Sequence, residues 1–173
     1  MLIVDLDDTL VASTKFNNDA YNYALDKFDF SEIAIEARIT RENLTHIKPE
    51  ILEKIVKEKQ KYFAKEWLPY RLIVNNELLA KMKEFGQKSC FLWTKADKNR
   101  ANIVIKNLRL KKYLTDIIFD NKNDFAKSLK LIKNRTKASE IIIYENEKLS
   151  GLKVVDIIEN SNFKITGYLV SLQ

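Results

Sequence analysis

The sequence predicts an α/β fold in which helices cover both faces of a parallel sheet. After Gly86, short apolar runs alternate with stretches of helical periodicity, the pattern of successive strand–helix units. Most of these runs are apolar at every position, as expected for strands buried on both faces. The 173-residue chain holds only 3 glycines and 2 prolines, where average usage would give about 12 and about 9. This scarcity argues against a turn-rich β-sandwich.

The first predicted element is a buried strand over residues 2–6, where Leu, Ile and Val precede Asp5. Residues 17–28 place their apolar side chains at helical spacing. A second helix is predicted to start at Pro49, because proline suits the first turn of a helix, and to end before Pro69. Residues 29–48 fit either helix or loop.

Residues 76–173 carry the rest of the predicted sheet. Residues 76–85 form an amphipathic helix that Gly86 is suited to cap. The later predicted elements are strands at 89–94, 117–119, 140–144 and 163–170 and helices at 97–108, 124–133 and 147–159. Because residues 13–75 show no strand pattern, they are predicted to be a helical insertion, and residues 1–12 and 76–173 to be the sheet-containing core.

Composition excludes several kinds of site. The single cysteine, Cys90, rules out a disulfide framework and a cysteine zinc cluster, and favours a cytoplasmic location. No glycine-rich nucleotide-binding motif occurs. The first apolar run ends at Val4 and is followed by three aspartates, which is too short and too acidic for a signal peptide. No stretch is long enough to span a membrane without charges, so no membrane partner is expected.

The net charge of +6 is concentrated in one segment. Residues 81–112 hold 10 basic and 2 acidic residues, a net charge of +8. Such a segment is typical of a solvated lysine-rich surface, or of a site for a polyanion or phosphorylated substrate.

Polar residues follow several of the predicted strands. Asp5 and Asp7 follow the first strand, Thr94 ends the second, and Glu145 and Asn146 follow the fourth. Ligands of such folds bind outside the carboxyl ends of the strands, so these groups are predicted to meet at one edge. The segments before and into the helix at 124–133 add two lysines, Lys122 and Lys127.

Asp5 and Asp7 suggest phosphoryl-transfer chemistry. On an extended chain, residues two apart project to the same side, where two carboxylates would repel unless a cation intervened. One carboxylate could attack phosphorus, and the other could protonate the leaving oxygen and activate water. Mg²⁺ held by carboxylates would neutralise the pair, Thr94 could hydrogen-bond a phosphoryl oxygen, and a lysine could hold the phosphate.

Each residue also has a plainer interpretation. Asp5 and Asp7 could belong to a turn. Thr94, Glu145 and Asn146 could cap the elements that follow them. Either lysine could be a solvated surface charge.

The motif LIVDLDDTLVAS, residues 2–13, resembles the first motif of the haloacid dehalogenase-like (HAD) superfamily, and CFLWTKAD, residues 90–97, is similar to the second. The resemblance implies a three-layer Rossmann-like core with a helical cap inserted after the first motif. It also implies a Mg²⁺-dependent phosphatase with Asp5 as nucleophile and Asp7 as general acid and base.

Two features depart from the family pattern. The phosphate-binding lysine could be Lys122 or Lys127, since each resembles the placement in one branch of the superfamily. IIIYENE, residues 141–147, resembles the fourth motif but lacks its usual aspartates, so Glu145 or Asn146 must complete a metal site with Asp5 and Asp7.

The sequence therefore predicts a Mg²⁺-dependent phosphohydrolase that acts through an aspartyl-phosphate on a phosphorylated small molecule or nucleotide. The basic segment adds nucleic-acid ends as candidate substrates. Two alternatives stay open: a catalytically degenerate binding module of the same fold, and a phosphotransferase or phosphomutase that uses the same residues. The sequence does not determine the oligomeric state.

Overall fold

The computed structural model describes residues 1–66 and 72–172 and divides into two compact units. The first unit consists of Met1–Ala12 and Ile73–Gln173, and the second of Ser13–Leu72. Among the described residues, no helix combines the length and apolarity that a membrane span requires.

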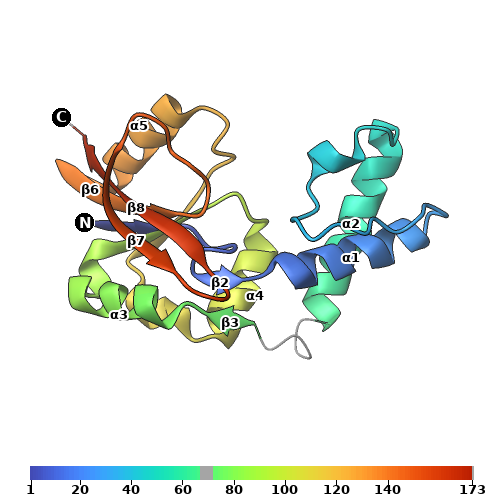
Figure 1. Ribbon diagram of the computed structural model, residues 1–173, viewed down its shortest axis with the longest axis horizontal. Helices are drawn as coiled ribbons and strands as arrows, with labels where there is room; N and C mark the ends of the chain where they lie inside the picture. The colour runs from blue at the N-terminus through green and yellow to red at the C-terminus, as the bar shows by residue number, and fades with distance from the viewer. Residues whose placement is uncertain (67–71, 173) are drawn as a thin grey trace. The chain divides into compact units, whose positions relative to one another are not determined.

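The first unit is built on a six-stranded sheet with the order β5-β4-β1-β6-β8-β7 (Figure 1). The four strands β5, β4, β1 and β6 run parallel, and β8 and β7 run antiparallel to their neighbours. The strands are β1 (Leu2–Val4), β4 (Cys90–Thr94), β5 (Asp116–Phe119), β6 (Glu140–Glu145), β7 (Lys153–Glu159) and β8 (Lys164–Ser171). The predicted α/β fold with a parallel-sheet core is confirmed.

Three helices cover the sheet: α3 (Asn76–Phe85), α4 (Lys98–Asn107) and α5 (Phe125–Thr136). From β1 through β4 to β5 the chain moves across the sheet in one direction, and from β5 to β6 it returns. Because such crossovers are right-handed, α3 and α4 lie on one face and α5 lies on the other. Figure 1 shows α3 and α5 on opposite sides of the sheet. The structure thus has the three predicted layers.

The two faces of the sheet bury alternate residues of the same strands. Ile3, Phe91 and Trp93 belong to a buried cluster that also includes Ile132 of α5. Their neighbour Cys90 points to the other face, where its thiol contacts the Met82 carbonyl of α3. The carboxyl ends of β1, β4 and β6 therefore lie at one edge of a sheet that is packed from both sides.

The C-terminal part corrects two predictions. Residues 147–159 were expected to be helical, but residues 153–159 form β7, and β8 joins the sheet antiparallel. Four of the seven β7 residues are β-branched and apolar, which favours a strand. A short turn, in which Asn160 and Phe163 exchange backbone hydrogen bonds, makes the pair antiparallel. In β7, apolar residues such as Ile157 also occupy exposed positions at the edge of the sheet. The strand therefore does not alternate between apolar and polar residues, and its sequence pattern resembled that of a helix.

The boundary of the insertion also differs from the prediction. Residues 73–75 were assigned to the insertion, but β3 (Ile73–Val74) belongs to the first unit. It pairs antiparallel with β2 (Val11–Ala12), and the Asn75 amide donates to the Leu10 carbonyl. The chain leaves the first unit after Ala12 and returns to it at Ile73. The β2–β3 pair therefore connects these two segments within the first unit.

The second unit is helical. It contains α1 (Thr14–Asp26), the 3-10 turn η1 (Arg41–Leu44) and α2 (Pro49–Glu66). The predicted end of the second helix, just before Pro69, lies outside the described residues. Residues 29–40 form no regular element, and buried Asn17 and Asn18 hold this segment by hydrogen bonds to backbone groups of residues 37–39.

Candidate active site

Asp5 lies at the point where β1 ends. Its backbone amide donates to the Tyr144 carbonyl of β6 at 3.0 Å, which extends the parallel ladder by one bond. Its residue surface is only 6% exposed. The sheet therefore fixes the Asp5 carboxylate beside the carboxyl end of β6.

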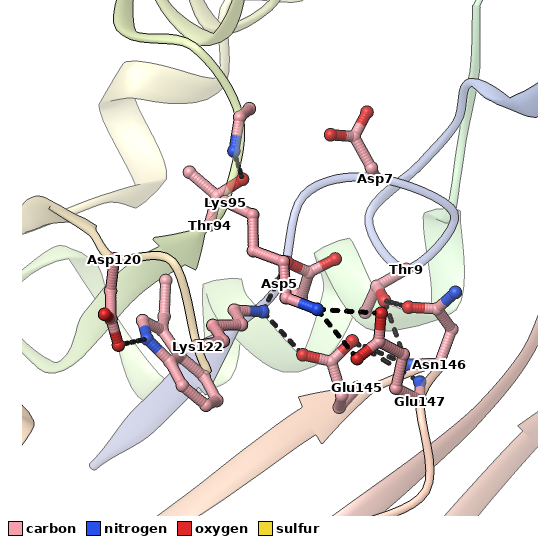
Figure 2. A network of polar contacts seen from close by, with 12 residues as sticks. Asp5, Asp7, Thr9, Thr94, Lys95, Asp120, Lys122, Glu145, Asn146 and Glu147 are labelled. Atoms are coloured by element: carbon pink, nitrogen blue, oxygen red, sulfur yellow. Dashed lines mark hydrogen bonds and ion pairs between the residues drawn. The ribbon is translucent and has the colours of Figure 1, made fainter. Parts of the chain in front are cut away.

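Lys122 supplies the cation of the cluster. Its ammonium lies 2.6 Å from Asp5 Oδ1 and 2.6 Å from Glu145 Oε2, and its side chain is 6% exposed. Figure 2 shows the ammonium between the two carboxylates. Asp5, Lys122 and Glu145 are called the carboxylate–lysine cluster below. They come from three segments that are far apart in the sequence.

The loop between β5 and α5 orients the Lys122 side chain towards Asp5 and Glu145. Lys122 adopts a left-handed backbone conformation with φ 56, which is uncommon for a residue other than glycine. Its ammonium lies 4.2 Å from the centre of the Trp93 ring. The Trp93 indole donates to Asp120 at 3.1 Å, and the Ser128 hydroxyl donates to the same oxygen. The Lys122 ammonium thus lies against the Trp93 ring, and Asp120 holds that ring in place.

Burial and charge set the protonation of this cluster. Burial raises the pKa of Asp5 to about 7; the Lys122 ammonium opposes this shift, and Glu145 and Asp7 add to it. For Lys122, burial lowers the pKa, but the charges of Asp5 and Glu145 outweigh burial and raise it above its ordinary value. Lys122 therefore stays charged at neutral pH, and Asp5 titrates close to neutrality.

Asp7 lies apart from the carboxylate–lysine cluster. The expectation that Asp5 and Asp7 project to one side assumed an extended chain, but β1 ends at Val4. The chain then turns, with the amides of Leu10 and Val11 donating to the Leu6 carbonyl. In Figure 2 the Asp7 carboxylate points away from Lys122. It accepts a hydrogen bond from the buried Arg100 guanidinium of α4.

Thr94 and Asn146 lie at the same edge of the sheet. The Thr94 hydroxyl accepts from the Ala96 amide at 3.0 Å, a local turn that also fits its plainer interpretation. The Thr9 hydroxyl donates to Asn146 Oδ1 and accepts from the Asn146 amide, both at 3.1 Å. Thr9 thereby fixes Asn146 directly beside Glu145.

Lys127 is not part of the site. Its side chain is 85% exposed on α5, where it forms an ion pair with Asp124 at 3.3 Å. Asp124 is the residue that caps α5, since its side chain accepts from the Lys127 amide. Of the two candidate lysines, the structure brings only Lys122 to Asp5.

Sequence reasoning missed Arg100, Trp93 and Asp120. Arg100 was one of ten basic residues in the segment 81–112, and nothing in the sequence separates a buried arginine from exposed ones. Trp93 was assigned only to a buried strand. The sequence also did not indicate the ion pair between Lys95 and Glu147 at 3.0 Å, which joins the segments that follow β4 and β6.

Comparison with known proteins supports the fold. No family model matches the chain, and no curated protein matches it. A haloacid dehalogenase-like hydrolase from Streptococcus pneumoniae matches 80% of this chain and 70% of its own, at 17% identity and a TM-score of 0.62. A predicted phosphoglycolate phosphatase from Haemophilus somnus matches 80% of this chain over 72% of its own length, at 9% identity and a TM-score of 0.61. A β-phosphoglucomutase candidate from Thermotoga maritima matches 82% of this chain over 74% of its own length, at 18% identity and a TM-score of 0.54. The chain therefore has the haloacid dehalogenase-like fold.

Proposed function

From this fold and the carboxylate–lysine cluster, we propose that the protein is a phosphohydrolase that forms an aspartyl-phosphate on Asp5. One observation carries the proposal: a buried ammonium lies 2.6 Å from Asp5 and 2.6 Å from Glu145 at the carboxyl edge of the sheet. A buried cation in this position can orient the attacking carboxylate and offset the charge of a phosphoryl group.

The roles proposed for Asp5 and Lys122 follow from their placement in the cluster. Those proposed for Asp7 and Thr94 follow from the resemblance of residues 2–13 and 90–97 to the haloacid dehalogenase-like motifs. The ionised Asp5 carboxylate attacks phosphorus, and the bond from phosphorus to the leaving oxygen breaks. Asp7 gives a proton to that oxygen and then takes one from the water that hydrolyses the aspartyl-phosphate. Lys122 holds Asp5 and a phosphoryl oxygen, and Thr94 donates its hydroxyl to another. Arg100 keeps the Asp7 side chain in place between turnovers.

Mg²⁺ is part of the proposal. Among residues 1–66 and 72–172, no three Asp, Glu, His or Cys side chains form a ready-made metal site. Mg²⁺ does not need one, because it keeps several waters and binds through one or two carboxylates together with substrate phosphate oxygens. Asp5, Glu145 and the Asn146 amide oxygen would offer oxygen donors of this kind, and the Asp7 main-chain carbonyl is a further candidate ligand. The bound ion would neutralise charge on the phosphoryl group.

The substrate class follows from the same chemistry. We propose a phosphate monoester of a small molecule or nucleotide, and the phosphate-bearing end of a nucleic acid as a further candidate. Transfer to an acceptor other than water is a second candidate reaction, since one protein of this fold is a β-phosphoglucomutase candidate. Incorporation of labelled oxygen from water into the released phosphate distinguishes hydrolysis from such transfer.

The decisive experiment compares Asp5→Asn with Asp29→Asn, the same change at an exposed residue of the second unit. Both variants and the wild type are assayed on p-nitrophenyl phosphate, sugar phosphates, nucleoside monophosphates and 5′- or 3′-phosphorylated oligonucleotides, with and without Mg²⁺. We expect Asp5→Asn to lose at least about 10³-fold in turnover, because it removes the nucleophile. Asp29→Asn should match the wild type.

Two results would contradict the proposal. Undiminished turnover by a correctly folded Asp5→Asn variant would remove Asp5 from the chemistry. A folded wild-type protein that turns over none of the substrates, with or without Mg²⁺, would favour the binding-module alternative instead.

A further inference from the structure

A surface pocket of about 680 Å³ lies in the first unit, formed by the end of α4, the 3-10 turn η4 (Leu110–Tyr113) and the start of β5. Four of its lining residues are cationic: Lys106, Arg109, Lys111 and Lys112. The whole pocket is called the basic pocket below. Its volume falls in the range of ligand-binding pockets.

The basic pocket is distant from the candidate active site. In the parallel pair of β4 and β5, Phe91 lies opposite Asp116 and Thr94 opposite Phe119. Asp116, which lines the pocket, therefore begins β5, whereas Thr94 ends β4. Three residues of strand separate the two levels, or about 10 Å. The two sites open at opposite edges of the sheet.

The positive charge of the pocket is not neutralised within the described part of the chain. Some cations of the segment 81–112 have carboxylate partners: Lys81 pairs with Asp156, and Lys95 with Glu147. No described carboxylate forms an ion pair with any of the four cations of the basic pocket. Asp116, the one acidic residue in its lining, lies instead 3.6 Å from Arg135.

The end of α4 does not account for these charges. A helix C-terminus carries about half a negative charge, which a single cation such as Lys106 offsets. Three further cations remain. Lys112 also lies 4.9 Å from the centre of the Tyr113 ring, and Lys83 of α3 lies 5.6 Å from it. The positive surface therefore continues from the pocket towards α3.

The apolar lining residues Ile105 and Leu114 are buried, whereas the four cations are exposed, so the floor of the pocket is apolar and its rim is cationic. Cations at the rim suit successive phosphates, and an apolar floor suits the face of a base that has left its stack. A duplex keeps its bases stacked, and the Asp and Glu side chains of an acidic peptide carry no ring comparable to a base. We propose that the basic pocket binds single-stranded nucleic acid, with phosphates on the four cations and a base over the apolar floor.

This proposal does not depend on the chemistry at Asp5. The test therefore uses the full chain carrying Asp5→Asn, so that hydrolysis cannot consume the probe. Binding of a fluorescein-labelled 20-nucleotide deoxythymidine strand is followed by fluorescence anisotropy between 50 and 200 mM KCl. Four phosphate contacts predict a salt slope of about −3, and hence a roughly fiftyfold loss of affinity over this range.

A matched pair of triple variants locates the binding. Lys106→Gln, Lys111→Gln and Lys112→Gln together should leave a slope of about −0.7, and roughly a threefold loss over the same range. Arg109 is left unchanged, since its left-handed backbone makes it a poor site for substitution. Lys130→Gln, Lys133→Gln and Lys148→Gln remove the same charge from exposed positions elsewhere and should bind like the Asp5→Asn parent.

Several outcomes would overturn the proposal. One is no binding at 50 mM KCl. Another is an equal loss of affinity in both triple variants, which would show that only net charge matters. Equal affinity for a 20-base-pair duplex would contradict a pocket for an unstacked base. Equally effective competition by polyglutamate would assign the surface to acidic proteins instead.

Discussion

Lys122 at the carboxyl edge of the sheet and the lysines of the basic pocket at the amino edge carry the same charge in opposite surroundings. Lys122 is buried, and its ammonium contacts two carboxylates. Lys106, Lys111 and Lys112 are exposed, and no described carboxylate pairs with them. A buried charge requires a partner, whereas an exposed charge is stabilised by water and acts at a distance. The first arrangement suits chemistry at a fixed point, and the second suits attraction of a polyanion.

The largest difference between the two edges is expected in stability. Lys122→Met leaves the buried carboxylates of Asp5 and Glu145 without their cation, so we expect a loss of about 3–5 kcal/mol in the free energy of unfolding. Lys127→Met is the matched control, because Lys127 is exposed and should cost less than about 0.5 kcal/mol. Urea unfolding followed by circular dichroism measures both.

A Lys122→Met variant that unfolds at the same urea concentration as Lys127→Met would contradict the contrast between the two edges. If Lys122→Met does not fold at all, the double variant Lys122→Met with Glu145→Gln provides the test. Removing one carboxylate of the cluster should restore part of the lost stability.

Sequence patterns predicted the core elements well, for a physical reason. Parallel strands such as β4 and β6 are buried on both faces, and a short, continuous apolar run is typical of such strands. β7 was mistaken for a helix because it lies at the sheet edge, where Val155 and Ile157 are exposed. There the residue pattern no longer reports burial, and only the pairing with β8 defines the strand.

The candidate site was predicted in part. Strand ends identified Asp5, Thr94 and Glu145, since the fold brings such ends together. The sequence left Lys122 and Lys127 undecided, because the choice depends on the left-handed turn at Lys122, which no local pattern indicates. Arg100 was missed for a related reason: its burial depends on how α4 packs, and its sequence neighbours are ordinary surface residues.

The ion pair of Asp156 on β7 is intermediate in burial between the carboxylate–lysine cluster and the exposed lysines of the basic pocket. It accepts from the Tyr144 hydroxyl at 2.6 Å and pairs with Lys81 at 3.0 Å, with both charged side chains 30% exposed. Burial alone would raise the pKa of Asp156, but the Tyr144 hydroxyl and Lys81 outweigh burial and lower it. A lowered pKa means that the folded state favours the ionised form. The resulting stability is fully present above the ordinary Asp pKa near 4 and is lost as the pH falls through the folded value.

Asp156→Asn should therefore cost about 1 kcal/mol at pH 7, and the difference from wild type should shrink as the pH falls below the ordinary Asp pKa near 4. Urea unfolding at several pH values measures this. Glu159→Gln, on the same strand, removes an exposed pair with Lys164 and should stay within about 0.5 kcal/mol throughout. A cost for Asp156→Asn that is unchanged from pH 7 to pH 3 would show that packing, and not ionisation, causes it.

The smallest effect is expected from the basic pocket itself. Lys106→Gln, Lys111→Gln and Lys112→Gln together remove neighbouring like charges, so the melting temperature should stay equal or rise by about 1–2 °C in 20 mM KCl. In 300 mM KCl the gain should vanish, since the Debye length falls well below 10 Å. The cost of Lys122→Met should barely change with salt, because its partners are at most 8% exposed and salt screens buried pairs much less than exposed ones. A triple variant that melts several degrees lower at both salt concentrations would show that these lysines stabilise the fold, and the two edges of the sheet would then differ in degree only.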